Sequence, residues 1–389
     1  MRVYFDNSAT TPLDPEVRGA MQPFLDGVFG NPSSLHQDGR EARAAVEAAR
    51  GEVAALIGAE PAEIVFTGSG TEADNLALVG AFEKQEARRH FVASAIEHPA
   101  ILETLGYLQG RGASVTLVRP NPDGLLSVDQ IASALRPDTR LVSVMAANNV
   151  VGTLQPVGDV GRLCRERGVL FHTDAVQAAG KMPLDVRADG IDLLSMSAHK
   201  LHGPKGVGAL FVRKGVSLAP VVHGGGQERG LRSATENVAG IVGFGRAAAL
   251  ARASHADEAA RLVRLRDRLL DGLASSVPSV RLLGHRFRRL PGHLCLALEG
   301  QEGETIKLLL ALDEAGIAVS TGSACSASHA SQPSHVLLAM GLDPIRARGS
   351  LRLTLGRFNT EDEVERFLAV FPEIVARLRP VMSRPLATA

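Results

Sequence analysis

Short runs of apolar residues alternate with stretches of helical periodicity between residues 60 and 215. Each run has a length typical of a buried strand. The runs are Ile64–Phe66, Phe91–Ala93, Val115–Val118, Leu141–Met145, Val169–Phe171, Asp192–Met196 and Gly208–Val212. Because helical stretches lie between most of these runs, the pattern predicts an α/β fold with a large, doubly wound, mainly parallel sheet.

Helical periodicity is clearest from Gln37 to Ile57, where apolar residues recur three and four positions apart and Gly58 supplies a stop. A second long helix is expected from about Ala247 to Ala274, and it would carry the chain into a smaller α+β domain. That domain would contain strands near Val280–Leu283, Leu294–Leu298 and Leu351–Leu355, and helices near Glu304–Ala315 and Thr360–Leu378. We therefore predict a large domain at residues 15–257 and a small domain made of residues 1–14 and 258–389.

Composition narrows the class of protein. Of the 389 residues 45% are hydrophobic and 22% charged, and 42 basic residues balance 42 acidic ones. These values exclude global disorder, and they disfavour direct binding to nucleic acid or to an anionic membrane. The three Cys have no paired spacing, and neither a secretory signal nor a long apolar run is present. We therefore expect no disulfide scaffold, no structural zinc site and no membrane span, and we expect a cytoplasmic location.

Polar residues follow three of the expected strands, at the edge where ligands bind in sheets of this kind. Gly68–Glu72 follows the first strand and opens a helix. Its small residues and free N–H groups could hold a phosphate, although a plain strand-to-helix turn would look the same. The segment lacks both the GxGxxG pattern and the GK[ST] ending, so a nucleotide site is disfavoured.

An acid and a lysine end two later strands. Asp174, with Gln177 three positions further on, could hold a protonated ring nitrogen or could cap a following helix. Lys200 is one of only six lysines. A lysine behind an apolar strand becomes a nucleophile toward carbonyl groups when it is desolvated, whereas a lone lysine is usually a surface amine. A phosphate cup, an acid and a lysine in this order match the needs of pyridoxal phosphate.

With these residues in place, the chain resembles the class V aminotransferase-like, fold-type I pyridoxal-phosphate enzymes, and within them the cysteine desulfurases of the IscS/NifS group. The resemblance runs almost from end to end of the chain. The matching motifs lie at Asp6–Pro12, Phe29–His36, Phe66–Asn75, Glu97–Ala100, Asn148–Gly152, His172–Gln177, Ser197–Gly206, Arg229–Thr235, Thr321–Cys325 and Ser350–Arg357.

The resemblance implies how the cofactor would be held. Lys200 would bind its aldehyde, Asp174 its ring nitrogen and Gln177 its ring hydroxyl. His98 would stack on the ring and help to move protons. The phosphate would be held by Gly70, Thr71, Ser197 and His199, together with Thr235 from a second subunit of a homodimer.

The resemblance also implies a substrate and a nucleophile. Asn149 and Arg352 would grip the carboxylate of L-cysteine. Cys325 lies in a segment of small polar residues, and it would take the substrate sulfur as a persulfide while L-alanine leaves. A lone thiol there could otherwise be idle. Cys164 and Cys295 lie in apolar stretches and are predicted to be buried.

The implied partners are a sulfur-acceptor or iron–sulfur scaffold protein, with tRNA thiolation as another destination of the sulfur. No resident metal is expected, although Cys325 would transiently contact an iron–sulfur cluster. The chain departs from the group at Val150, where an acid is common, and at Gln332, where Glu is common. The segment Ser326–Gln332 is also about one residue longer than in the group.

Three alternatives share this fold: a selenocysteine lyase, a class V aminotransferase, and a non-catalytic binding scaffold. An aminotransferase has no need of the Cys325 thiol. A scaffold has no need of Lys200, Asp174 and His98 together.

Overall fold

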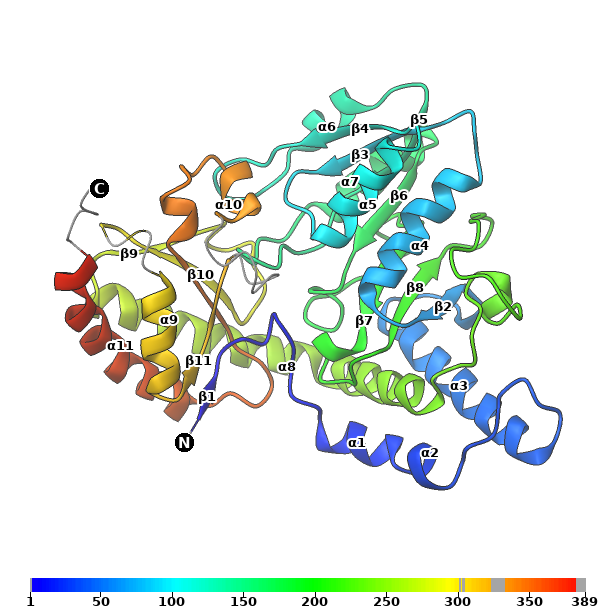
Figure 1. The fold of residues 1–389 in the computed structure, drawn as a ribbon, viewed down its shortest axis with the longest axis horizontal. Coiled ribbons are helices and arrows are strands. Elements are labelled where there is room, and N and C mark those ends of the chain that lie inside the picture. Colours follow the sequence, from blue (N-terminus) through cyan, green and yellow to red (C-terminus); the bar gives the residue numbers. More distant parts are fainter. Residues whose placement is uncertain (1, 301, 303–304, 323–332, 383–389) are drawn as a thin grey trace, which may run out of the picture.

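A seven-stranded sheet forms the core of the larger part of the molecule in the computed structural model, which describes residues 2–300, 302, 305–322 and 333–382 (Figure 1). Its strands, in spatial order, are β2 (Ile64–Thr67), β8 (Gly208–Val212), β7 (Leu193–Ser197), β6 (Leu170–Asp174), β5 (Thr139–Ser143), β3 (His90–Ser94) and β4 (Ser114–Val118). Strands β3 to β7 are parallel, and β8 is antiparallel to both of its neighbours. All seven predicted strands form, and the mainly parallel sheet is confirmed.

Helices cover both faces of this sheet. They are α3 (Gln37–Leu56), α4 (Gly70–Glu83), α5 (Pro99–Gln109), α6 (Val128–Ala134), α7 (Val157–Arg167) and the long α8 (Val238–Ser276), while the short helices α1 (Pro15–Met21) and α2 (Pro23–Asp26) pack on α8. One apolar core joins the sheet to α3, α6, α7 and α8, and another joins it to α4 and α5. This layered arrangement is the doubly wound architecture that the alternation predicts.

Helix α8 begins earlier than its sequence suggests. Asn237 caps it, with Oδ1 accepting from the Gly240 N–H at 3.0 Å, whereas periodicity predicted a start near Ala247. The first turns are rich in glycine, a poor helix former, and this obscured the pattern. A Cβ on Gly245 would lie 2.6 Å from the Ala49 Cα, so glycine there allows α8 to pack closely on α3.

The rest of the chain forms two small sheets with their own core. Strand β1 (Val3–Tyr4) pairs with β11 (Ile317–Ala318), and a four-stranded antiparallel sheet has the order β12 (Ser320–Thr321), β13 (Ser350–Thr354), β10 (His293–Leu298), β9 (Val280–Leu282). Helices α9 (Thr305–Glu314), α10 (His335–Ala339) and α11 (Glu361–Met382) complete this part. Helix α8 runs beneath both parts (Figure 1), and the proposed boundary between residues 257 and 258 falls inside it. That boundary stays a prediction.

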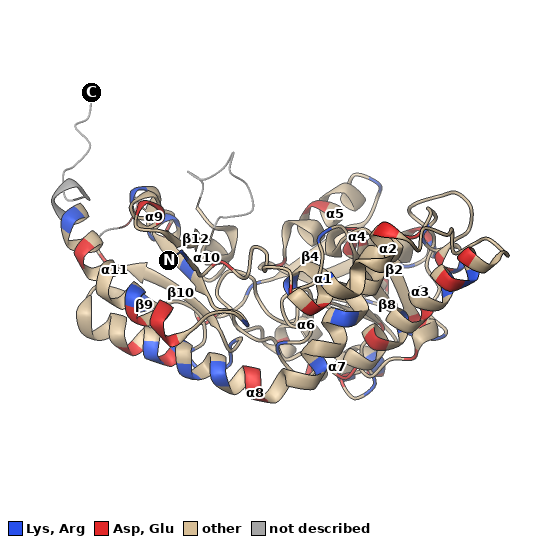
Figure 2. Cartoon of the chain, turned by 90° about the horizontal axis from the view of Figure 1, so that it is seen from below, with Lys and Arg blue, Asp and Glu red and all other residues tan. Residues whose placement is uncertain are grey.

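Charges of both signs are interspersed on the surface. Figure 2 shows basic and acidic residues mixed along α8 and α11, and Arg268 on α8 donates to Glu365 on α11 at 2.7 Å. None of the described helices has the length and apolar character that a membrane crossing needs.

Candidate active site

A cavity of about 330 Å³ lies beyond the carboxyl ends of the parallel strands. It is lined by Ser8, Ala9, Ser69, Gly70, Thr71, Asp74, His98, Met145, Asn149, Asp174, Val176, Gln177, Ser197, His199, Lys200 and Arg352. The lining contains every site residue predicted from the sequence except Thr235 and Cys325. Thr235 is exposed on a loop of the same chain, and Cys325 lies outside the described residues.

The first turn of α4 forms one end of this cavity. Ser69 caps the helix, and its Oγ accepts a hydrogen bond from the Glu72 N–H at 3.0 Å. The other N–H groups of the first turn have no carbonyl partner within the helix. A Cβ on Gly70 would lie 2.6 Å from Val176 Cγ2, so this position requires glycine. Free N–H groups and the helix dipole together suit a phosphate group.

Two further polar residues reach the same cavity from the end of β7. Ser197 is its last residue, and His199 lies in the short 3₁₀ helix η2 (Ala198–Lys200). His199 Nδ1 is 3.1 Å from Thr10 Oγ1. Burial, with the nearby charge of Lys200, lowers the pKa of His199 to about 4, so the imidazole is neutral and can donate one hydrogen bond.

Asp174 is the last residue of β6, and Gln177 lies on the turn that follows it rather than on a helix. Asp174 Oδ1 accepts from the Val176 N–H at 2.9 Å, and Gln177 Nε2 donates to the Ser8 carbonyl at 2.9 Å. Gln177 Oε1 is buried without a partner. Burial raises the pKa of Asp174, while His98 and Lys200 oppose that rise. A cationic group in the cavity would therefore be held strongly by Asp174.

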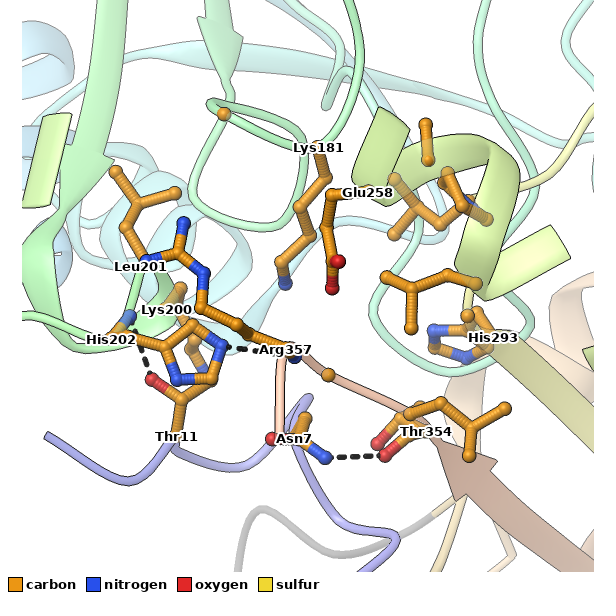
Figure 3. A pocket seen from close by; sticks show the side chains of 18 of the residues that line it. Asn7, Thr11, Lys181, Lys200, Leu201, His202, Glu258, His293, Thr354 and Arg357 are labelled. Carbon is orange, nitrogen blue, oxygen red and sulfur yellow. Dashed lines mark hydrogen bonds between the residues drawn. The ribbon is translucent and has the colours of Figure 1, made fainter. Parts of the chain in front are cut away.

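Lys200 stands between this cavity and a second one. Its Nζ donates to the Ala9 carbonyl at 2.8 Å and also to the Ser8 carbonyl. The second cavity lies behind it, and the amine of Lys181 and the carboxylate of Glu258 point into that space (Figure 3). Lys181 is partly exposed as a residue, but burial of its amine, with Lys200 and Arg352 nearby, lowers its pKa to about 7. The N-terminal segment thus forms part of the wall of both cavities.

His98 follows β3 and caps α5. Its Nδ1 accepts from the Ala100 N–H at 3.1 Å, so in the neutral ring the proton is on Nε2. Burial lowers the pKa of His98, and nearby Lys200 and His335 lower it further, whereas Asp174 raises it. The ring is therefore a neutral imidazole that can take up a proton.

Arg352 reaches the cavity from β13 in the small sheet. One guanidinium nitrogen donates to the Asn149 carbonyl at 2.9 Å and another to Asp6 Oδ1 at 3.0 Å. The residue is 3% exposed, and its Nε is buried without a partner. A fixed guanidinium with an unused donor suits a carboxylate ligand. Asn149, which the family resemblance implied as a substrate-binding residue, also lines the cavity.

Sequence analysis missed Asp74, which lies one helical turn after Gly70. It is 1% exposed, its Oδ1 has no hydrogen-bond partner, and that atom is 3.6 Å from His172 Nε2. Burial and the neighbouring Asp174 raise the pKa of Asp74. The four-residue spacing from Gly70 places both on one face of α4, and that spacing was the available signal. The backbone carbonyls of Ser8 and Ala9, which accept from Lys200, could not be recognised as part of the site from side-chain types in the sequence.

The other two cysteines are buried away from solvent, as predicted. Cys164 packs in the core beneath the large sheet, and Cys295 packs beside α10. Burial raises the pKa of each thiol to about 12. Neither is available as a thiolate nucleophile.

Comparison with known proteins places this site in a family. The family model described as Aminotransferase class-V matches residues 3–367. The chain belongs to the class V aminotransferase family. Enzymes of this family depend on pyridoxal phosphate.

Relatives of this class V family member match it over almost their whole length. "Cysteine desulfurase IscS" from Methanosarcina thermophila is 48% identical over 97% of this chain and 93% of its own. A solved structure titled "NIFS-LIKE PROTEIN" superposes with a TM-score of 0.91 at 41% identity, covering 97% of this chain and 100% of that one. Another, "SspA in complex with cysteine", gives 0.81 at 36% identity over 92% and 100%.

The cavity fits pyridoxal phosphate by its own chemistry. It offers free N–H groups at the start of α4 for a phosphate and a buried carboxyl at Asp174 for a protonated ring nitrogen. The unpartnered Gln177 Oε1 can accept a hydrogen bond from a ring hydroxyl. The Lys200 amine is available to an aldehyde.

Proposed function

We propose that this protein is a cysteine desulfurase, which converts L-cysteine to L-alanine and leaves the sulfur as a persulfide on Cys325. The observation that carries the proposal is one cavity in which Lys200, Asp174 and Arg352 face a common space. These groups suit an amine-binding cofactor and a substrate carboxylate. The thiol at Cys325 and the cysteine desulfurase named among the relatives support the sulfur chemistry.

The residues that would bind the cofactor and the substrate come from both the large-sheet part and the small-sheet part of the molecule. The cofactor supplies an aldehyde and a ring that withdraws electrons from the bound amino acid. Gly70, Thr71, Ser197 and His199 would hold its phosphate, and Gln177 its hydroxyl. The guanidinium of Arg352 and the amide of Asn149 would hold the substrate carboxylate from the small-sheet side.

Proton and sulfur transfer follow from the remaining groups. Lys200 would hold the cofactor through its aldehyde, and the Lys200 amine would remove the Cα proton of the substrate. Asp174 would hold the protonated ring nitrogen of the cofactor. His98 would accept the thiol proton of Cys325. The thiolate then attacks the substrate sulfur, the Cβ–S bond breaks, and L-alanine leaves after it has been protonated.

We further infer that two copies of the chain form a homodimer and that the protein passes its sulfur to a partner. Thr235 is exposed, and so are the apolar side chains of Phe29 and Leu35, at 86% and 85%. A second copy of the chain would cover such a surface and would bring Thr235 to the other phosphate site. The persulfide would pass to a sulfur-acceptor or iron–sulfur scaffold protein, or toward tRNA thiolation. A free thiol nucleophile suits a reducing compartment, which supports the cytoplasmic location.

The test is to incubate the protein with pyridoxal phosphate, L-cysteine and dithiothreitol and to measure sulfide and alanine. Both products are expected in equal amounts from the wild type. Cys325→Ser should reduce sulfide release by several orders of magnitude, because an alcohol is a poor nucleophile at its free pKa. It should still bind cofactor and substrate.

Each alternative has its own outcome in this assay. Formation of a keto acid instead of alanine would indicate an aminotransferase, and turnover of selenocysteine but not cysteine would indicate a lyase of that type. Absence of turnover of either would indicate a scaffold. Borohydride should attach the cofactor to Lys200, and a label on another lysine would contradict the assignment.

A further inference from the structure

His335 connects the small-sheet part of the molecule to the turn that carries His98. It is the first residue of α10, and its Nε2 lies 2.9 Å from the Glu97 carbonyl oxygen. A carbonyl oxygen only accepts hydrogen bonds, so Nε2 of His335 must donate. In the neutral ring the Nδ1 atom then carries no proton.

The acceptor belongs to the turn between β3 and α5. Glu97 is fully buried, and its Oε1 accepts from the Met145 N–H at 2.9 Å and from the Ser94 hydroxyl. The residue whose carbonyl accepts from His335 is therefore held in place by hydrogen bonds from β3 and from the segment after β5. His98 is the next residue along the chain.

Apolar packing surrounds this hydrogen bond. Val336 and Leu337 of α10 are buried in one cluster with Ile96 and Val150. Val150 occupies the position at which an acid is common in the desulfurase group. An apolar side chain there lets α10 pack against the large sheet without burying a charge. Helix α10 is therefore held against this turn by one hydrogen bond and by the buried apolar side chains around it.

We propose that His335 is a positioning residue, which holds the Glu97–His98 turn from the small-sheet side and is coupled electrostatically to His98. The inference rests on the proposed function, because it assigns to His98 the proton transfer of that reaction. His335 touches neither the substrate nor the cofactor in this role.

Several charged groups act on His98, and His335 is the one contributed by α10. Asp174 at the end of β6 favours the protonated ring, and Lys200 in η2 disfavours it. Asp74 and Arg352 also line the cavity. His335 lowers the pKa of His98, which helps to keep His98 free to accept a proton.

Two substitutions separate the hydrogen bond from the charge. His335→Gln keeps an N–H donor at nearly the position of Nε2 but cannot become charged. His335→Phe keeps a ring of similar shape but has neither the donor nor the charge. The full-length protein would be labelled at its histidine rings, and His98 would be followed by NMR titration without and with bound cofactor. Its signal is identified by its loss in His98→Gln.

In both variants we expect the pKa of His98 to rise by about half a pH unit, because a neighbouring positive charge is lost. The acidic limb of the kcat/KM profile should move to higher pH by the same amount. Hydrogen exchange of the Leu338 and Met340 amides, which bond within α10, should be unchanged in the Gln variant and about fivefold faster in the Phe variant.

An unchanged His98 titration in both variants would overturn the coupling. Equal exchange rates in the Gln and Phe variants would overturn the positioning role. Titration and exchange do not depend on turnover, so the proposal can fail or succeed even if the protein does not act on cysteine.

Discussion

At the scale of single residues, buried carboxyl groups dominate the electrostatics beneath the cavity. Asp74, Glu97 and Asp174 are each at most 6% exposed, and burial is the largest cause of the raised pKa of each. Asp174 also raises the pKa of Asp74 because two neighbouring negative charges repel each other. One negative charge on this pair of carboxyl groups is therefore favoured over two. A cationic ring beside Asp174 would select that residue as the ionised one.

Arg352→Ala should mainly raise KM for cysteine. The lost charge-assisted contact is worth roughly 2–4 kcal/mol when it is desolvated, so kcat/KM should fall about 30- to 1,000-fold. Arg352→Lys should recover only part of this, because a lysine lacks the planar fork. Steady-state kinetics provides the measurement.

A second variant serves as the control for that experiment. Removal of Arg352 also leaves Asp6 without its ion-pair partner at 3.0 Å, and a bare carboxylate would repel the substrate. Asp6→Asn combined with Arg352→Ala removes this repulsion. If the double variant recovered wild-type kcat/KM, Arg352 would have no direct role in binding the substrate.

Glu97→Gln should change how stability depends on pH. Burial raises the pKa of Glu97 to about 8. Between about pH 5 and pH 8 the folded protein therefore keeps a proton that the unfolded chain releases, and the free energy of unfolding falls as pH rises. Glutamine is always neutral and still offers an oxygen to Ser94 and Met145.

Urea unfolding of the cofactor-free protein at pH 5.5 and pH 8 measures this effect. The wild type should lose more stability between these two values than Glu97→Gln does. The same loss in both proteins would mean that Glu97 is already ionised in the folded state.

At the scale of elements, a buried ion pair holds the loop that carries Thr235. Arg50 on α3 donates to both carboxylate oxygens of Glu228, at 2.7 and 2.8 Å. The Phe66 N–H of β2 donates to the same carboxylate at 2.8 Å. Glu228 and Arg229 have φ values of 48° and 58°, a conformation that side chains other than glycine adopt only at a cost. The ion pair therefore fixes a strained turn in η3 (Glu228–Gly230).

Arg50→Met should be strongly destabilising. It leaves the Glu228 carboxylate buried without a cation, which typically costs about 3–5 kcal/mol of unfolding free energy. Arg268→Met is the matched control, because its pair with Glu365 is exposed on both sides and contributes little to stability. Urea denaturation of both variants would give the comparison. A similar small loss in each would show that the buried pair contributes no more than a surface pair.

At the scale of the whole molecule, the cavity is closed by segments that are far apart in the sequence. The N-terminal segment crosses from β1 to the large sheet, where the Thr11 N–H donates to the His199 carbonyl at 3.1 Å. Arg352 comes from the small sheet, and Lys200 from the large one. A relative movement of the two parts would therefore change both the cavity that Arg352 lines and the wall behind Lys200.

A mixed dimer tests the proposed contribution of Thr235 across subunits. One subunit carries Lys200→Ala and its partner carries Thr235→Ala. If Thr235 acts in trans, the site with an intact Lys200 lies in the Thr235→Ala subunit and receives its threonine from the Lys200→Ala subunit. That site should retain cofactor as the wild type does. Retention as weak as in the Thr235→Ala homodimer would mean that Thr235 serves its own chain.

The sequence by itself determined the strands, the order of the chemical groups and most of the site. Buried parallel strands are continuous apolar runs, so their number and their positions along the chain could be predicted directly, and polar residues after them mark the ligand edge. Motif order then pointed to Lys200, Asp174, His98 and the family. The start of α8 was missed because its glycines serve packing against α3, which no local pattern reveals.

Only the tertiary structure decided which groups lie close to one another. The backbone carbonyls of Ser8 and Ala9 hold Lys200, and Asp6 holds Arg352, although more than 190 and 340 residues respectively separate these partners in the chain. Backbone atoms carry no sequence signal, and the depth of burial that shifts the pKa of Asp74 and Glu97 depends on what packs around them. Contacts of this kind arise from the packing of distant segments, which local sequence does not encode.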